Sequence, residues 1–239
     1  MPSYYLPETF NVGETVRLSA DETAHALRVM RLEPGERLTL LNGRGGRAAA
    51  VLLDDGPTRK IREASCRIES TETVPQPQLS IVLYVAPPRN KNMDTVLKSA
   101  TELGVARIVP VICRYAVSRP DASAATSWSQ TLVTAMKQSG NPWLPELDAP
   151  IAFSDALSAS DDDGFFGAVP REDDLRTSSL PYTPSRLSLW VGPEGGFSKE
   201  EIELAKENGV TPVGLGERIL RTETASAYVL SALAYLTEL

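Results

Sequence analysis

The chain has 239 residues, 42% of them hydrophobic and 23% charged, which is enough length for two compact domains and enough apolar material for their cores. A net charge of −7 argues against a uniformly basic nucleic-acid binder. A single histidine, and two cysteines without CxxC spacing, argue against a metal site or a histidine-based catalytic triad.

The start of the chain and its hydropathy lead to an expectation about location. The first residues, MPSYYLPETF, lack the basic stretch and long apolar run of a secretory signal. No segment approaches the roughly 18 consecutive apolar residues that a membrane helix needs. We therefore expect a cytoplasmic protein with no membrane partner.

Residues 12–68 are predicted to form a β-rich domain. Strand-like runs at residues 37–41 and 47–53 flank Asn42-Gly43, and Asn-Gly between two apolar runs is a strong hairpin signal. Residues 21–30 have the pattern of a short helix, with Asp21 as its predicted N-cap.

This domain has a local excess of positive charge, with nine basic and five acidic residues between positions 25 and 67. Such a surface can bind phosphates, although composition alone slightly favours a solvated sheet surface with scattered charges. His25, Arg28 and Arg31 follow helical spacing and are predicted to share one side of the short helix. Arg44 and Arg47 flank the hairpin glycines, where a phosphate can approach closely. A packed, hydrogen-bonded side chain is the alternative for the histidine. The candidates are His25, Arg28, Arg31, Arg44 and Arg47.

The segment Glu72–Gln78 contains two prolines and no hydrophobic periodicity, which predicts a domain boundary and divides the chain into residues 1–74 and 75–239. Beyond it, strand and helix patterns alternate, as in an α/β sheet with helices on its faces. The predicted strands cover residues 79–86, 107–112, 165–169, 187–191 and 211–216, and the predicted helices cover residues 93–103, about 127–138, 198–208 and 224–239.

Two glycine-rich turns follow strands near the end of the chain. Residues 192–196 read Gly-Pro-Glu-Gly-Gly, and Ser198 and Glu201 then have the spacing of a capping box. Residues 214–216, Gly-Leu-Gly, follow the next strand. Turns at the carboxyl ends of strands form the crevice where an open α/β sheet usually binds its ligand, and glycines let the backbone approach that ligand. A purely structural role in two tight turns is the alternative.

The familiar nucleotide-binding motifs do not fit. The chain has no GxxxxGK[ST], and Ile219 stands where GxGxxG requires a glycine. This argues against a P-loop, a Rossmann dinucleotide domain and a Rossmann-type methyltransferase. The final helix is apolar almost all round, so either the chain's own core or a second subunit must cover it.

Taken together, these segments resemble the RsmE family, the bacterial 16S rRNA uridine-N3 methyltransferases of the SPOUT superfamily. Val191–Ser198 (VGPEGGFS) resembles the first signature loop of the family, and Leu215–Ala225 (LGERILRTETA) resembles the second. Lys98–Val105 and His25–Leu32 are supporting segments. The likeness covers nearly the whole chain.

The resemblance implies a small PUA-like β-barrel followed by a SPOUT α/β domain with a trefoil knot. It implies S-adenosylmethionine as the cofactor and 16S rRNA or the small ribosomal subunit as the partner. It also implies a homodimer formed through the knotted domain and the C-terminal helix. The cofactor would lie against Val169, Gly192, Glu194, Gly195, Leu215, Gly216, Ile219, Leu220, Arg221 and Thr224.

Methyl transfer to N3 of a uridine requires both partners to be held at attack distance and N3 to lose its proton. Arg221 is the candidate partner for the charge that grows on the uracil carbonyl. Glu223 and Glu194 are the candidate bases. The alternatives are structural: a salt bridge from Arg221 to either glutamate, or a Glu223 that only stabilises the start of the last helix.

One segment departs from the family. Lys137 and Asn141 stand on the middle helix where many members have an acid and an arginine, within a Glu-Gln-Ser/Cys-x-Arg run. This charge reversal argues against a role for that acid and leaves both glycine turns unchanged.

Two other functions remain open on the sequence, besides a nucleotide-binding enzyme of some other chemistry, which the missing phosphate-loop motifs argue against. One is a SPOUT enzyme acting on a tRNA base or a ribose 2′-hydroxyl, which the PUA-like start and the near-complete likeness argue against. The other is a non-catalytic RNA-binding protein of ribosome maturation that kept the fold. Binding of S-adenosylmethionine without methyl transfer would indicate the latter.

Overall fold

The computed structural model describes residues 1–56, 61–89, 92–120, 122–160, 164–168, 175–176 and 185–238. Its contacts divide the chain into two compact units. The N-terminal unit contains Met1–Gln76 and Met136–Leu144, and the C-terminal unit contains Pro77–Ala135 and Pro145–Leu239. No sequence signal predicted that Met136–Leu144 belongs with the N-terminal unit.

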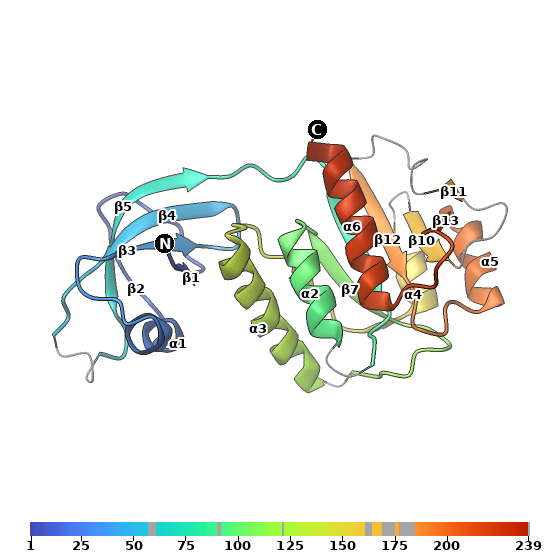
Figure 1. Ribbon diagram of the computed structural model, residues 1–239, viewed down its shortest axis with the longest axis horizontal. Helices are drawn as coiled ribbons and strands as arrows, with labels where there is room; N and C mark the ends of the chain where they lie inside the picture. The colour runs from blue at the N-terminus through green and yellow to red at the C-terminus, as the bar shows by residue number, and fades with distance from the viewer. Residues whose placement is uncertain are drawn as a thin grey trace. The chain divides into compact units, whose positions relative to one another are not determined.

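The N-terminal unit is built on a five-stranded sheet in the order β1-β3-β4-β5-β2 (Figure 1). Its core is made of apolar side chains that alternate along these strands, among them the fully buried Tyr4, Leu38 and Leu40. The strands are β1 (Ser3–Tyr5), β2 (Thr15–Arg17), β3 (Arg37–Leu41), β4 (Gly46–Leu52) and β5 (Ser65–Thr73).

The predicted hairpin is confirmed. Strands β3 and β4 pair antiparallel, with Leu41 opposite Arg47. Between them the Asn42 side chain accepts hydrogen bonds from Arg44 N and Gly46 N, both at 2.8 Å. An asparagine that bonds to the backbone following it favours this kind of tight loop.

The predicted helix at residues 21–30 begins earlier than expected. Helix α1 (Ala20–Ala24) is capped by Ser19, whose hydroxyl accepts a hydrogen bond from Glu22 N at 3.3 Å. Asp21 as the N-cap is therefore wrong, because Ser19 and Glu22 already have the Ser-x-x-Glu spacing that favours a helix start.

A change of helix type then separates the three basic candidates of this segment. The chain continues as a π-helical turn, η1 (His25–Val29), in which Met30 N donates to His25 O at 2.9 Å. Because a π-helix bonds residue i to i+5, residues three and six apart do not return to one face. Arg31 lies past the turn, with a φ of 57°. The expectation that His25, Arg28 and Arg31 share one helix side is wrong.

A buried ion pair accounts for the charge reversal at Lys137. The Lys137 Nζ lies 2.7 Å from Glu22 Oε1 and 3.0 Å from Oε2, and the two side chains are only 19% and 9% exposed. Tyr5 N also donates to Glu22 Oε1, at 3.4 Å. Asn141, the second departure, accepts a hydrogen bond from Trp143 N at 3.0 Å. Both departures therefore stabilise the N-terminal unit.

The C-terminal unit contains a parallel sheet in which the described strands follow the order β11-β13-β10-β12-β6-β7-β8, with β9 paired to β7. The predicted alternation of strands and helices is confirmed, whereas β8, β9, β11 and α4 were not predicted. The strands are β6 (Ser80–Val85), β7 (Arg107–Ile112), β8 (Glu146–Leu147), β9 (Ile151–Ala152), β10 (Gly164–Ala168), β11 (Leu175–Arg176), β12 (Arg186–Val191) and β13 (Val210–Gly214). The helices are α2 (Asn92–Glu102), α3 (Ala122–Ser139), α4 (Phe153–Ser158), α5 (Lys199–Glu207) and α6 (Thr222–Glu238).

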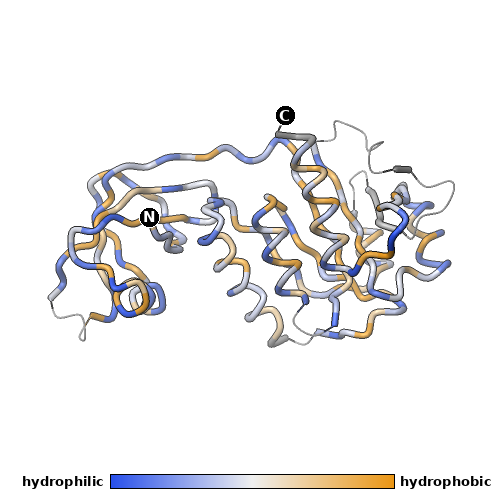
Figure 2. Tube along the Cα trace, viewed as in Figure 1, coloured by the Kyte–Doolittle hydropathy of each residue, from blue (hydrophilic) through white to orange (hydrophobic). Residues whose placement is uncertain are grey.

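Helices cover both faces of this sheet, as expected for strands that are apolar along their whole length (Figure 2). On one face, the Trp190 ring stacks on Tyr84 with their centroids 3.8 Å apart, and Phe153 of α4 meets it edge-on at 5.5 Å. Ala205 of α5 belongs to the same cluster. Helices α2 and α6 lie side by side on the sheet (Figure 1).

Two further expectations concern the described helices and the knot. Within the described ranges, none of the helices is both long and apolar enough to cross a membrane. Nothing in the described part of the chain tests the trefoil knot that the resemblance implies, so the knot stays a prediction.

We expect Lys137→Glu to lower the free energy of unfolding by about 3–5 kcal/mol. The substitution leaves the buried Glu22 carboxylate without its partner and places a second negative charge beside it. Urea denaturation of the full chain, followed by circular dichroism, measures the change.

The matched control is the double variant Glu22→Lys with Lys137→Glu, which restores opposite charges at the same two positions. We expect it to regain most of the lost stability. A Lys137→Glu variant as stable as the unmodified protein would show that the ion pair contributes nothing.

Candidate active site

The register of three parallel strands brings the two glycine turns to one edge of the sheet. Gly167 of β10 pairs with Val191 of β12 on one side and with Val213 of β13 on the other. Since neighbouring strands lie about 4.8 Å apart, the two turns begin at the same level and roughly 10 Å from each other. Val169, which follows β10 between them, lies outside the described residues.

The first turn, residues 192–196, needs glycine for close packing. A Cβ atom on Gly192 would lie 3.0 Å from the Phe197 ring, and one on Gly195 would lie 3.0 Å from Tyr115 Cβ. The predicted capping box then starts α5: Glu201 N donates to Ser198 Oγ at 3.2 Å, and Ser198 N donates to Glu201 Oε2 at 2.8 Å. The turn is therefore held rigidly between β12 and α5.

The second turn leaves its backbone accessible. Gly216 has a φ of 97°, and a Cβ atom there would meet no atom within 4 Å. Ile219 is 78% exposed, which is unusual for a large apolar side chain, while Leu215 and Leu220 are half-buried. An uncovered apolar side chain beside an accessible glycine backbone fits a flat, partly apolar ligand.

A hydrogen bond between the two segments joins the start of α6 to the first turn. The buried Thr222 hydroxyl donates to Gly192 O at 2.9 Å. Because Thr222 is only six residues beyond Gly216, this bond ties the second turn to the first. Sequence reasoning missed Thr222, because a threonine in a helix more often bonds within its own helix.

The two candidate bases are held by Asn92, the first residue of α2, and by Arg89 in the loop that follows β6. Asn92 Nδ2 donates to Glu223 Oε1 at 3.1 Å, and Arg89 N donates to Glu194 Oε1 at 3.3 Å. Glu223 Oε2 is buried and, in the described part of the chain, has no hydrogen-bond partner. A buried carboxylate oxygen without a partner is costly, so it points to a ligand group that this oxygen contacts.

Arg221 and Thr224 lie on either side of Glu223 in the sequence, and both are exposed. Among the described residues, Arg221 forms no salt bridge with Glu194 or Glu223. The salt bridge to either glutamate, which was the structural alternative for Arg221, is therefore absent from the described part of the chain. Its guanidinium remains available to a ligand.

The five basic candidates of the N-terminal unit differ in their environments. Arg28 and Arg31 are exposed, whereas His25 is half-buried with its ring edge-on to Tyr4 at 5.8 Å. Arg44 Nη2 donates to the carbonyl oxygen of Pro7 at 2.6 Å. The Arg47 guanidinium contacts the Glu72 carboxylate at 3.2 Å and the carbonyl oxygen of Gly140 at 3.1 Å. Thus both hairpin arginines already have protein partners.

Comparison with known proteins assigns the class. Residues 75–234 match the RNA methyltransferase domain family, and residues 18–60 match the RNA methyltransferase PUA domain family. The parallel sheet with its paired turns is therefore an RNA methyltransferase domain, and the N-terminal sheet is a PUA-like unit. The expected fold class is confirmed in these two parts.

Relatives narrow the class to one family. The ribosomal RNA small subunit methyltransferase E of Aquifex aeolicus is 32% identical over 92% of this chain and 94% of its own length. Its counterpart from Synechocystis is 30% identical over 95% of this chain and 75% of its own length. The chain belongs to the ribosomal RNA small subunit methyltransferase E family, as the resemblance implied.

Solved structures agree over the whole chain. The methyltransferase E of Neisseria gonorrhoeae, bound to S-adenosyl methionine, has a TM-score of 0.89 and 32% identity, covering 99% of this chain and 98% of that one. A Legionella pneumophila protein in complex with the cofactor SAM also has a TM-score of 0.89, with 31% identity, covering 98% of this chain and 96% of that one.

Proposed function

We propose that this protein transfers the methyl group of S-adenosylmethionine to N3 of one uridine in the 16S rRNA of the small ribosomal subunit. The observation that carries the proposal is the pairing of β10 with both β12 and β13, which sets the two glycine turns side by side. Relatives named for small-subunit rRNA methylation, and two solved with the cofactor, support it. The proposal places the protein in the cytoplasm with its substrate.

The residues present fit the cofactor. Gly216 and Gly195 would let backbone N–H and C=O groups approach an adenine, and Ile219, Leu215 and Leu220 would cover its faces. The bound cofactor supplies an electrophilic methyl group on a sulfonium. We assign the same role of cofactor contact to Val169, Gly192, Glu194, Arg221 and Thr224, of which Val169 lies outside the described residues.

Glu223 is the preferred proton acceptor for uridine N3. Its Oε1 is fixed by Asn92, while the buried Oε2 has no partner in the described part of the chain. Glu194 is the weaker candidate, because it is exposed and already accepts a hydrogen bond from Arg89 N. Arg221 lies two residues before Glu223 and stabilises the negative charge that develops on the uracil carbonyl as N3 loses its proton.

The N-terminal unit contributes the RNA contacts. Arg28 and Arg31 are exposed and, in the described part of the chain, have no ion-pair partner, so they are the leading phosphate contacts. Arg44 and Arg47 already donate to backbone carbonyl oxygens, and His25 packs on Tyr4. These three residues are therefore the weaker candidates for phosphate contacts.

A homodimer through α6 belongs to the same proposal. Tyr228 and Tyr235 of this helix are 49% and 67% exposed. Large aromatic side chains are enriched at protein interfaces, so a second copy of the chain is the occupant that we propose for this side of α6.

The proposed activity is tested by incubating the purified protein with S-adenosylmethionine and small-subunit rRNA, and mapping the product by mass spectrometry. We expect one added methyl group, on the base of a single uridine and at N3. Methylation of a tRNA base or of a ribose would contradict the target. Cofactor binding with no transfer to any RNA would contradict the enzymatic activity.

We expect Gly216→Ala to weaken binding of S-adenosylmethionine at least tenfold, measured by calorimetry. The φ of 97° is unfavourable by about 1–2 kcal/mol for a residue with a Cβ atom, so the turn must shift. Gly209→Ala is the matched control, because Gly209 has a φ of 79°, similar open space, and a position after α5. Equal loss of cofactor affinity in both variants would argue against a cofactor contact at Gly216.

We expect Arg221→Ala to slow single-turnover methyl transfer by about 10²–10³-fold at saturating cofactor, because a charge-stabilising donor is lost from the transition state. Arg218→Ala is the control, since it removes an exposed arginine from the same segment. Rapid-quench measurements give both rates. An unchanged rate for Arg221→Ala would remove this residue from the mechanism.

A further inference from the structure

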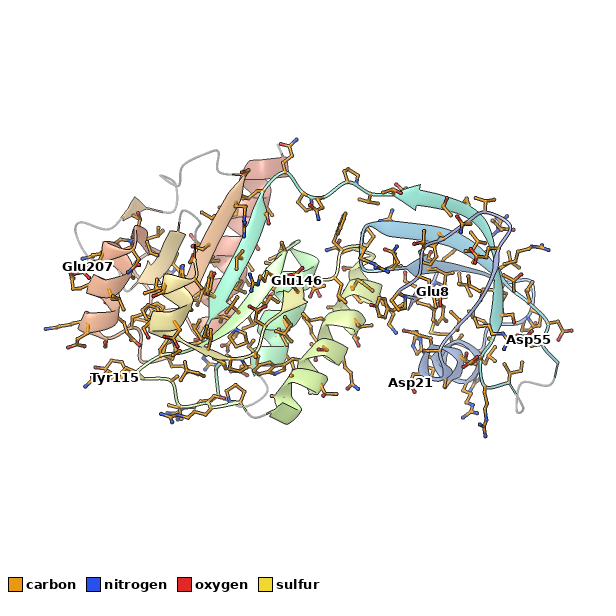
Figure 3. The ribbon with its side chains drawn as sticks, turned by 180° about the vertical axis from the view of Figure 1, so that it is seen from behind. Glu8, Asp21, Asp55, Tyr115, Glu146 and Glu207 are labelled. Carbon is orange, nitrogen blue, oxygen red and sulfur yellow. The ribbon has the colours of Figure 1, made fainter. Side chains whose placement is uncertain are left out.

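An exposed aromatic side chain lies against the first glycine turn. Tyr115 lies on the loop after β7 (Figure 3). Its side chain is 49% exposed. A Cβ atom added to Gly195 would lie 3.0 Å from Tyr115 Cβ, 3.6 Å from Cγ and 3.8 Å from Cδ2. The side chain thus contacts the turn that the proposed function assigns to the cofactor, while about half of its surface faces solvent.

The residues on either side of Tyr115 are fixed. Arg114 N donates to Glu201 Oε1 at 2.7 Å, and the same carboxylate forms the capping box of α5. On the other side, Ala116 N donates to Cys113 O at 3.1 Å, and Ala116 packs against the core cluster that contains Phe153. The tyrosine is therefore held in place by its neighbours rather than by burial of its own ring.

Cys113 helps to anchor this loop and offers no chemistry of its own. It is 5% exposed, and burial raises the pKa of its thiol well above the usual range. A buried, protonated thiol is a poor nucleophile. The groups that the loop presents to solvent are therefore the tyrosine ring, Val117 and the neighbouring arginines.

Two of these arginines are exposed on the same loop. Arg114 and Arg119 are both exposed, and neither has an ion-pair partner among the residues that the structure describes. An aromatic ring held in place, with exposed guanidinium groups in the same loop, is the combination that binds single-stranded nucleic acid. Bases stack on the ring, and the cations contact the phosphates.

We propose that Tyr115 is a stacking platform for an unpaired base of the substrate RNA beside the target uridine, with Arg114 and Arg119 contacting the flanking phosphates. This inference rests on the proposed function and adds a substrate contact that the glycine-turn signatures do not include. Stacking on a tyrosine tolerates any base, so the loop contributes affinity and position rather than sequence discrimination.

The test compares Tyr115→Leu with Tyr115→Phe. Leucine still packs on Gly195 but cannot stack on a base, whereas phenylalanine keeps the ring and loses only the hydroxyl. The probe is a single-stranded RNA oligonucleotide with the sequence around the methylated uridine. We expect the leucine variant to bind it about 5- to 150-fold more weakly, and the phenylalanine variant to stay within about twofold of the unmodified protein. Both variants should bind S-adenosylmethionine normally.

Salt dependence tests the arginines separately. Removing one phosphate contact should reduce the slope of log affinity against log salt concentration by about 0.7 for a single strand, so we expect this change in Arg119→Ala. Lys206→Ala is the matched control, because it removes an exposed cation from α5 of the same unit. Its slope should be unchanged.

The results of these binding tests distinguish a failure of the stacking role from a failure of the proposed methyltransferase function. If the unmodified protein methylates the RNA but the leucine and phenylalanine variants bind it equally well, the stacking role is wrong and the function stands. If Tyr115→Leu loses cofactor binding, the tyrosine only supports the turn, and the inference is again wrong. An unmodified protein that binds the cofactor but no RNA would overturn the proposed function together with this contact.

Discussion

The parallel pairing of β10 with two neighbours is the constraint on which the rest of the site depends. Because Gly167 is in register with both Val191 and Val213, the chain leaves β12 and β13 at the same level and on the same edge of the sheet. Two short turns from different parts of the sequence thereby lie at one edge of the sheet, where we propose that they form two walls of one site. The Thr222 hydroxyl then bonds the start of α6 to the first turn, and Asn92 at the start of α2 donates to the Glu223 carboxylate.

The N-terminal unit shows how a departure from a family pattern can be accommodated without altering the chemistry. Lys137 replaces an acid, and the buried Glu22 of α1 accepts two hydrogen bonds from its ammonium group. The exchange stays within that unit and touches neither glycine turn.

Burial and the nearby Glu22 carboxylate also raise the pKa of Tyr4 to about 12, so this core tyrosine stays protonated at any physiological pH.

Much of this arrangement was predictable from local sequence, because turn and cap signals act over a few residues. Asn42-Gly43 predicted the hairpin, Ser198 and Glu201 predicted the start of α5, and apolar runs located β6, β7 and β12. Local reasoning failed where two nearby residues could both cap a helix, since the N-cap of α1 is Ser19 and not Asp21. It also failed where a π-helical turn replaced an α-helix. It could not find Asn92, Arg89 or Thr222, because their partners lie 131, 105 and 30 residues away.

Hydrogen exchange with and without S-adenosylmethionine tests most directly whether the two turns form a single binding site. If they do, cofactor binding should slow exchange of the backbone amides at residues 192–196 and 214–221 together, and to a similar degree. The region after α5, around Gly209, should exchange at the same rate in both states. Protection confined to one turn, or binding that protects neither, would contradict the account.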